Sequence, residues 1–192
     1  MSRSFGSFEY EETSRHGRRV PALFRTDGRV LAWHVTMRLR VDSLIARNPR
    51  DFRAASKVIL RHGERSGLLA HRVVDTHVHA LVGADREQAG RFANYVESAL
   101  QQTLHLPQPF EPARFTPISD LRHLYRAVPY VLRQAERHGA RLDRVHDGTS
   151  LPDTLGLRCI DGGPSARLEA ALPRFDARDL LSLLGVTELA TE

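Results

Sequence analysis

The chain has 192 residues, of which 41% are hydrophobic, and this fits one globular domain with a short extension. A single cysteine, Cys159, excludes an intramolecular disulfide and a zinc finger, and no apolar run is long enough for a membrane helix or a secretory signal. The formal net charge of +5 comes almost wholly from arginine, since Lys57 is the only lysine. Arginine binds phosphate in a bidentate way, so we expect a cytoplasmic protein whose charge suits nucleic acid.

Hydrophobic periodicity predicts the elements in chain order. Residues 1–19 are polar with a basic end and predict a flexible arm. Alternating residues predict strands at 31–41, 68–74, 76–82 and 113–116. A 3.6-residue period predicts helices at 50–64, at 85–103 and from the Ser119–Asp120 cap to His138, where Gly139 ends the third helix. A tail from Asp147 begins with turn residues and closes with a short helix at 177–184.

This order of elements predicts the fold class. Strand, helix, strand, strand, helix, strand is the α+β order of a ferredoxin-like βαββαβ unit, with an antiparallel sheet and helices on one face. A further helix that carries Tyr130, and a short tail, follow this unit. We therefore divide the chain into a basic N-terminal arm at 1–24, a catalytic domain at 25–146 and a C-terminal extension at 147–192.

Two histidines, His77 and His79, stand one residue apart in an apolar, β-branched run. Because residues i and i+2 of a strand share a face, the two imidazoles are expected side by side, as a metal site requires. Imidazole suits several divalent metals, so the pair does not select one. The alternative is a pair of ordinary core or surface histidines with no ligand.

The third predicted helix offers Tyr130 and Gln134, which share a face because they are four residues apart. Gln134 could supply an oxygen to a metal on the histidines, with Tyr130 beside it; alternatively, Tyr130 packs on the sheet and Gln134 is solvated. Pro129 predicts a kink or a helix restart just before the tyrosine. Two other tyrosines are weaker candidates, because Tyr125 has a proline at the i+4 position and Tyr95 is expected to pack toward the sheet.

From about residue 15 to residue 145 the chain resembles the HUH-type single-strand DNA transposases with one catalytic tyrosine, and within them the REP-associated tyrosine transposases. The segment Leu69–Val82 resembles the strand pair that carries the family's His-hydrophobic-His motif. Trp33–Arg38 resembles the family's first strand, and Tyr130–Gln134 falls where its tyrosine helix lies. The Pro-Asn that usually precedes the histidine pair and the Asn-Pro that commonly follows the tyrosine are both absent here.

The resemblance implies that Tyr130 attacks a phosphate of single-stranded DNA at hairpin (repeat) sites, forms a 5′-phosphotyrosine and frees a 3′-hydroxyl, so that strands are cleaved and rejoined. It also implies an Mg²⁺ or Mn²⁺ ion on His77, His79 and Gln134. The partner would be single-stranded or hairpin DNA, and the protein would be nucleoid-associated and act as a monomer or homodimer. The arginines expected to bind this DNA are Arg15, Arg18, Arg19, Arg38, Arg126, Arg133 and Arg137.

Two other functions stay open at this point. A DNA-binding protein of transposase descent would keep the basic surface but lack cleavage. The segment Asp75–His79 also resembles the Asp-x-His-x-His metal motif of amidohydrolases, whose fold is a (β/α)₈ barrel of typically about 250 residues. The stretch that follows His79 is too short for the seven further strand–helix units of such a barrel.

Overall fold

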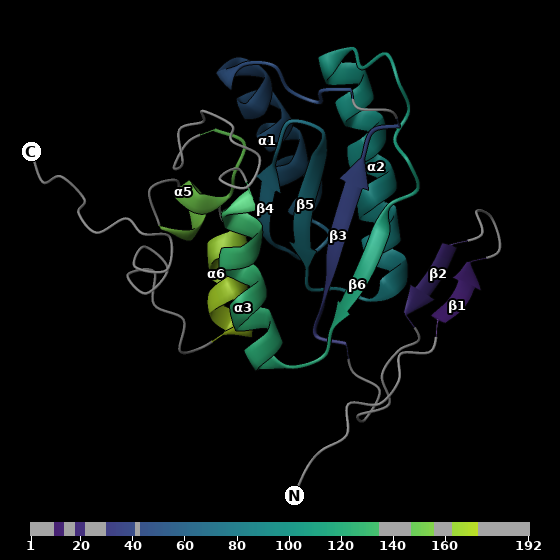
Figure 1. Ribbon diagram of the computed structural model, residues 1–192. Coiled ribbons are helices and arrows are strands. Elements are labelled where there is room, and N and C mark those ends of the chain that lie inside the picture. Colours follow the sequence, from purple (N-terminus) through teal and green to yellow (C-terminus); the bar gives the residue numbers. More distant parts are fainter. Residues whose placement is uncertain are drawn as a thin grey trace, which may run out of the picture.

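The computed structural model describes residues 10–13, 18–21, 30–40, 43–134, 147–155 and 163–172 of the chain. Its main sheet has four antiparallel strands in the order β4-β5-β3-β6 (Figure 1). The strands are β3 (Ala32–Arg38), β4 (Leu68–Val73), β5 (His77–Val82) and β6 (Arg114–Ile118). Helix α1 (Pro49–Gly63) follows β3, and helix α2 (Arg86–Leu104) follows β5. The expected ferredoxin-like βαββαβ unit is therefore confirmed.

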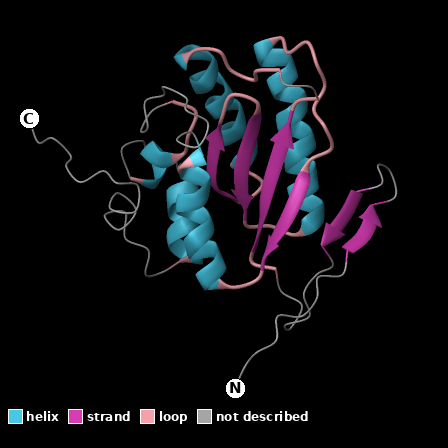
Figure 2. Ribbon diagram, viewed as in Figure 1, coloured by secondary structure: helices cyan, strands magenta, loops and turns pink. Residues whose placement is uncertain are grey.

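Different helices cover the two faces of the sheet (Figure 2). One face carries α1 and α2, whereas α3 (Leu121–Leu132) packs on β4 and β5 on the other. Helix α6 (Pro164–Ala171) also contacts β4, and α5 (Leu151–Thr154) contacts α6. The two helices of the βαββαβ unit thus share one face as expected, and the additional tyrosine-bearing helix covers the other. Apolar residues such as Ala70 and Leu81 point to that second face, which must therefore be covered as well.

The face under α1 and α2 holds the larger part of the core. Odd-numbered residues of β3 and even-numbered residues of β5 point to this face, because side chains alternate along a strand. They pack against apolar side chains spaced along α1 and α2, and the buried side chains that these strands and helices contribute to this core are at most 5% exposed. The set includes Trp33, Val35, Met37, Val78, Ala80 and Val82 from the sheet and Phe52, Ile59, Phe92 and Val96 from the helices.

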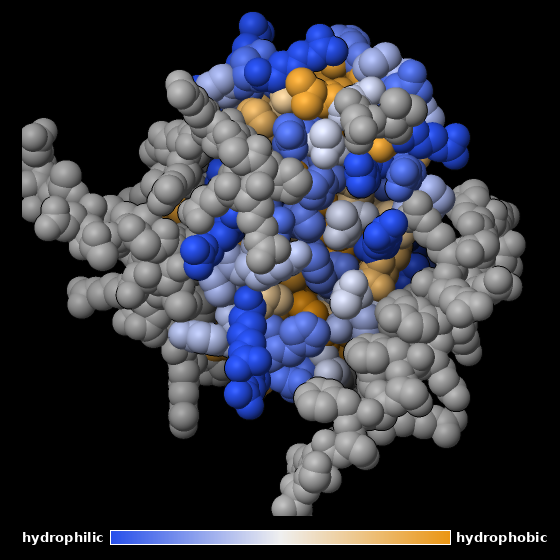
Figure 3. Space-filling view, viewed as in Figure 1, coloured by the Kyte–Doolittle hydropathy of each residue, from blue (hydrophilic) through white to orange (hydrophobic). Residues whose placement is uncertain are grey.

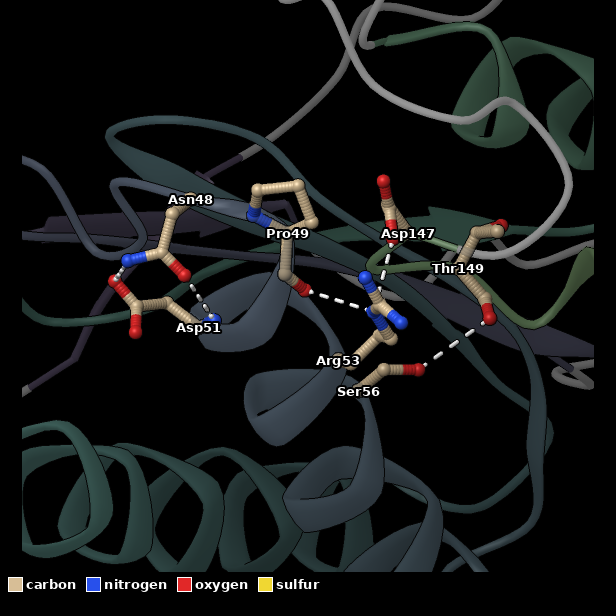
Figure 4. Close-up of polar contacts among 7 residues, drawn as sticks. All are labelled: Asn48, Pro49, Asp51, Arg53, Ser56, Asp147 and Thr149. Atoms are coloured by element: carbon tan, nitrogen blue, oxygen red, sulfur yellow. Dashed lines mark hydrogen bonds and ion pairs between the residues drawn. The ribbon is translucent and has the colours of Figure 1, made fainter.

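Side-chain caps define where the three longer helices begin. Asn48 accepts a hydrogen bond from the Asp51 backbone N–H at 3.0 Å, and Pro49 stands in the first turn of α1, where its missing N–H costs nothing (Figure 4). Asp85 caps α2 in the same way at 2.7 Å, and Asp120 caps α3 at 2.7 Å. These local rules explain why the predicted helix starts match the observed ones closely.

The end of α3 differs from the prediction. The helix ends at Leu132 and Arg133 leaves it with φ −87° and ψ 0°, while the expected range from residue 135 to His138 lies outside the described residues. Pro129 does not restart the helix either, because α3 continues through it. The buried stripe of Leu124, Val128 and Val131 packs on the sheet and compensates for the hydrogen bond that proline cannot donate.

Residues 147–150 join the edge of the sheet next to β4. The backbone N–H of Val73 donates to the Gly148 carbonyl at 2.7 Å, and that of Ser150 donates to the His71 carbonyl at 3.1 Å. Gly148 has φ +67°, and a Cβ atom there would lie 3.0 Å from the Phe52 ring, so both conformation and space require glycine. Arg53 of α1 also pairs with Asp147 at 3.3 Å (Figure 4). The start of the tail is therefore anchored to the sheet domain.

The N-terminal and C-terminal parts of the chain are expected from the sequence to form a flexible arm and a short helix. Strands β1 (Tyr10–Thr13) and β2 (Arg18–Pro21) pair as an antiparallel hairpin, and β2 contacts β6, so the expectation of a flexible arm is wrong for these residues. Four-residue strands are too short for periodicity to indicate them. The helix expected at 177–184 lies outside the described residues. In the ranges that the structure describes, no helix is both long and apolar enough to cross a membrane.

Candidate active site

The two histidines of β5 lie side by side on the face that α3 covers. The neighbours Val78 and Ala80 belong to the α1–α2 core, so His77 and His79 point to the opposite side. Their ring centroids are 4.6 Å apart, with the ring planes at 73°. His79 is 6% exposed and His77 is half-buried, so one ring lies inside the fold and the other lies nearer the solvent.

A third histidine, His34 of β3, completes this cluster. Its Nε2 atom is hydrogen-bonded to Nδ1 of His79 at 2.9 Å, and the two rings stack with centroids 5.1 Å apart. Burial, and then the positive charge of His123, lower the pKa of His34 from 6.5 to about 4. The neutral ring can therefore accept a hydrogen bond at Nε2 from the Nδ1–H group of His79. Sequence reasoning missed His34 because its nearness to His79 depends on the pairing of β3 with β5.

Both rings of the histidine pair are held at the same nitrogen. Nδ1 of His77 is hydrogen-bonded to the Thr76 hydroxyl at 3.0 Å, as Nδ1 of His79 is to His34. Partners of this kind usually fix the tautomer and orientation of metal-binding histidines. The arrangement assigns Nε2 as the atom through which each ring would hold a metal.

Tyr130 of α3 stands over the histidines. Its ring lies edge-on to His79 and to His34, with centroid distances of 6.3 and 5.8 Å. The side chain is 42% exposed, so its hydroxyl can meet both solvent and a substrate. Tyr95, by contrast, does not pack toward the sheet as expected, because it is 61% exposed and stacks on His62 of α1.

Gln134 lies just beyond the end of α3 and is 3% exposed. Its amide nitrogen donates a hydrogen bond to the carbonyl oxygen of Tyr130 at 3.1 Å. The amide oxygen is therefore the side-chain atom that could coordinate a metal. Among the residues that the structure describes, no three His, Cys, Asp or Glu side chains are grouped to hold a metal ion. Two imidazoles and an amide oxygen are nevertheless a donor set that suits a divalent cation.

The candidate DNA-binding arginines differ in how much of each the structure describes. Arg38 is exposed and directly opposite His77 in the β3–β5 pairing, and Arg126 and Arg133 are exposed on either side of Tyr130. Only the backbone of Arg18 and Arg19 is described, in β2. Arg15 and Arg137 lie outside the described residues.

Cross-strand pairing adds two arginines that sequence reasoning missed. Arg72 of β4 is opposite His79, Thr36 of β3 is opposite His79 on its other side, and Arg114 of β6 is opposite Thr36. These four residues form one polar row across the whole sheet, with a buried cation at one end and an exposed one at the other. Hydrophilic side chains accordingly predominate over the middle of this face (Figure 3).

No protein-family model matches the chain, and no curated protein matches it. One solved structure that resembles it is of a REP-associated tyrosine transposase bound to a REP hairpin, with a TM-score of 0.48 and 13% sequence identity. The match covers 72% of this chain and 75% of that chain. This likeness is distant, and the function proposed next rests on the side chains of the site.

Proposed function

We propose that this protein is a metal-dependent, HUH-type single-stranded DNA endonuclease and transposase that cleaves and rejoins hairpin DNA through a 5′-phosphotyrosine. The observation that carries the proposal is the position of Tyr130 over the histidine pair, with its ring 6.3 Å from that of His79. A half-exposed tyrosine hydroxyl beside two imidazoles, in a basic protein, suits phosphoryl transfer on a nucleic acid.

The chemistry of cleavage is a transesterification. The hydroxyl oxygen of Tyr130 attacks phosphorus, a new P–O bond to tyrosine forms, and the bond to the 3′-oxygen breaks. The 3′-oxygen leaves as a hydroxyl after it takes a proton, and the tyrosine proton passes to water, which reaches this half-exposed side chain. A 3′-hydroxyl reverses the step when strands are rejoined, and no ATP is needed because a phosphoester is kept throughout.

His77, His79 and Gln134 are the residues that would hold the metal in this proposal. A bound Mg²⁺ or Mn²⁺ ion supplies polarisation of a phosphate oxygen. His34 and Thr76 orient the two imidazoles through Nδ1, and the Gln134 amide is oriented by the Tyr130 carbonyl. Arg38, which is opposite His77, and Arg126 and Arg133, which precede and follow Tyr130 in the chain, are proposed to bind the phosphates of the strand.

The observed fold removes one alternative. An amidohydrolase needs a parallel (β/α)₈ barrel, and the strand pair that carries the histidines here belongs to a four-stranded antiparallel sheet. The resemblance of the Asp-x-His-x-His segment to that family is therefore coincidental. A DNA-binding protein without cleavage remains as the outcome that the experiment must separate.

The test is single-turnover cleavage of a labelled pool of hairpin oligonucleotides, with Mn²⁺ or with EDTA. The intact protein should form a covalent adduct that survives a denaturing gel, and only with the metal. Tyr130→Phe should form none and yet bind the pool, whereas Tyr125→Phe, on the same helix, should still form it. Binding without an adduct in the intact protein would indicate a DNA-binding protein that does not cleave. Loss of the adduct only in Tyr125→Phe would show that Tyr125, and not Tyr130, is the nucleophile.

A further inference from the structure

A pocket of about 110 Å³ opens beside the histidine pair, at the end of β3 and the start of β6. It is lined by Thr36, Arg38, His77, Glu111, Pro112 and Arg114. His77 thus forms part of the candidate metal site and also a wall of this pocket. Helix α3 packs on β4 and β5, so the pocket lies on the half of the face that α3 does not cover.

The sheet register fixes the position of the pocket relative to the proposed chemistry. Arg38 is directly opposite His77, and Arg114 is opposite Thr36, which is itself opposite His79. Neighbouring strands are about 4.8 Å apart, so the backbones of Arg114 and His79 are separated by roughly 10 Å. A strand of DNA held at the histidines would have to extend only a short distance across β3 to reach the pocket.

Charge and size limit what the pocket can hold. Two guanidinium groups and an imidazole face one carboxylate, that of Glu111, so an anion is favoured. Within the described part of the chain, no ion pair or side-chain hydrogen bond engages Arg114, which is exposed. The volume of about 110 Å³ leaves room for a phosphate group.

We propose that this pocket binds a phosphodiester of single-stranded DNA that flanks the one attacked by Tyr130, with Arg114 and Arg38 as its ligands. The inference rests on the proposed function and adds the direction of the strand, which crosses the sheet from β5 over β3 toward β6. The planar fork of each guanidinium matches two phosphate oxygens. Glu111 opposes this binding, and its removal should strengthen it.

The experiment measures binding of a fluorescein-labelled oligothymidine by anisotropy, in EDTA, with Tyr130→Phe as the background so that no cleavage occurs. The slope of log K against log salt between about 50 and 200 mM reports the phosphates contacted. Arg114→Ala should flatten that slope by about 0.7, the value for one phosphate on a single strand. Arg61→Ala, an exposed arginine of α1 on the opposite side of the sheet, should leave it unchanged.

Two further variants test the chemistry of the pocket. Arg114→Lys should keep the slope but bind more weakly, since the charge remains and the fork is lost. Glu111→Gln should bind more tightly at every salt concentration. If Arg114→Ala has the same salt slope and the same melting temperature as the background protein, the pocket does not bind a phosphodiester. The proposed cleavage by Tyr130 would not be affected by that result. No binding by the background protein itself would instead contradict the proposed function.

Discussion

The two faces of the main sheet are built from the same strands but from alternate residues, and they differ in kind. The face under α1 and α2 is largely apolar, and its buried polar side chains His71 and Ser56 are hydrogen-bonded to each other. The face under α3 is apolar at one end, where Leu81 and Ile118 meet α3, and polar at the other, where the histidines and arginines lie. Burial on the first face stabilises the fold, and incomplete burial on the second leaves charged side chains accessible. Each prediction below tests this separation of stability from chemistry.

The largest expected effect is on the apolar face. Phe92 of α2 is fully buried in the core, so Phe92→Ala should lower the free energy of unfolding by about 3–5 kcal/mol. Urea denaturation measures this change. Tyr130→Phe, on the other face, should stay within about 0.5 kcal/mol of the unmodified protein because it removes only a half-exposed hydroxyl. Equal losses in the two variants would show that the faces do not divide the roles.

The next effect concerns metal affinity. His34→Leu removes the imidazole that accepts a hydrogen bond from Nδ1 of His79. Mn²⁺ binding should weaken by about 10–100-fold, as measured by calorimetry on metal-free protein. His34→Gln should recover part of that loss, because its amide oxygen can accept the same hydrogen bond. If the leucine variant binds Mn²⁺ normally, or if glutamine binds no better than leucine, His34 does not position His79.

The tail gives a smaller effect at the edge of the sheet. The Ser150 hydroxyl accepts from the buried backbone N–H of His71 at 2.9 Å, so Ser150→Ala leaves that donor unsatisfied and should cost about 1–3 kcal/mol. Thermal unfolding measures the loss. Ser98→Ala, at an exposed position of α2, is the matched control and should change little. A neutral Ser150→Ala would mean that the Ser150 hydroxyl adds nothing to the stability of the sheet edge.

The smallest effect compares one cap on each face. Asp85→Ala and Asp120→Ala each remove a side-chain cap, from α2 and α3, and should each cost about 1 kcal/mol. Only α3 carries Tyr130, so only Asp120→Ala should also slow adduct formation in the hairpin assay. Equal rates in the two variants would indicate that the start of α3 has no influence on the tyrosine.

The sequence by itself determined the kinds and order of the elements from β3 to α3, because strand and helix periods and side-chain caps are local properties. It also determined that His77 and His79 share a face, since the period of a strand is two. Which side of the sheet α3 covers could not be predicted, because both faces of β4 and β5 carry apolar residues.

Only the tertiary structure decided which residues surround the histidine pair. His34 meets His79, and Arg114 aligns with Thr36, through the register of strands distant in the chain. A shift of one residue in either pairing would turn those side chains to the other face, and no local pattern fixes that choice. The same holds for the end of α3 and for residues 147–150, whose contacts with β4 depend on packing between segments far apart in sequence.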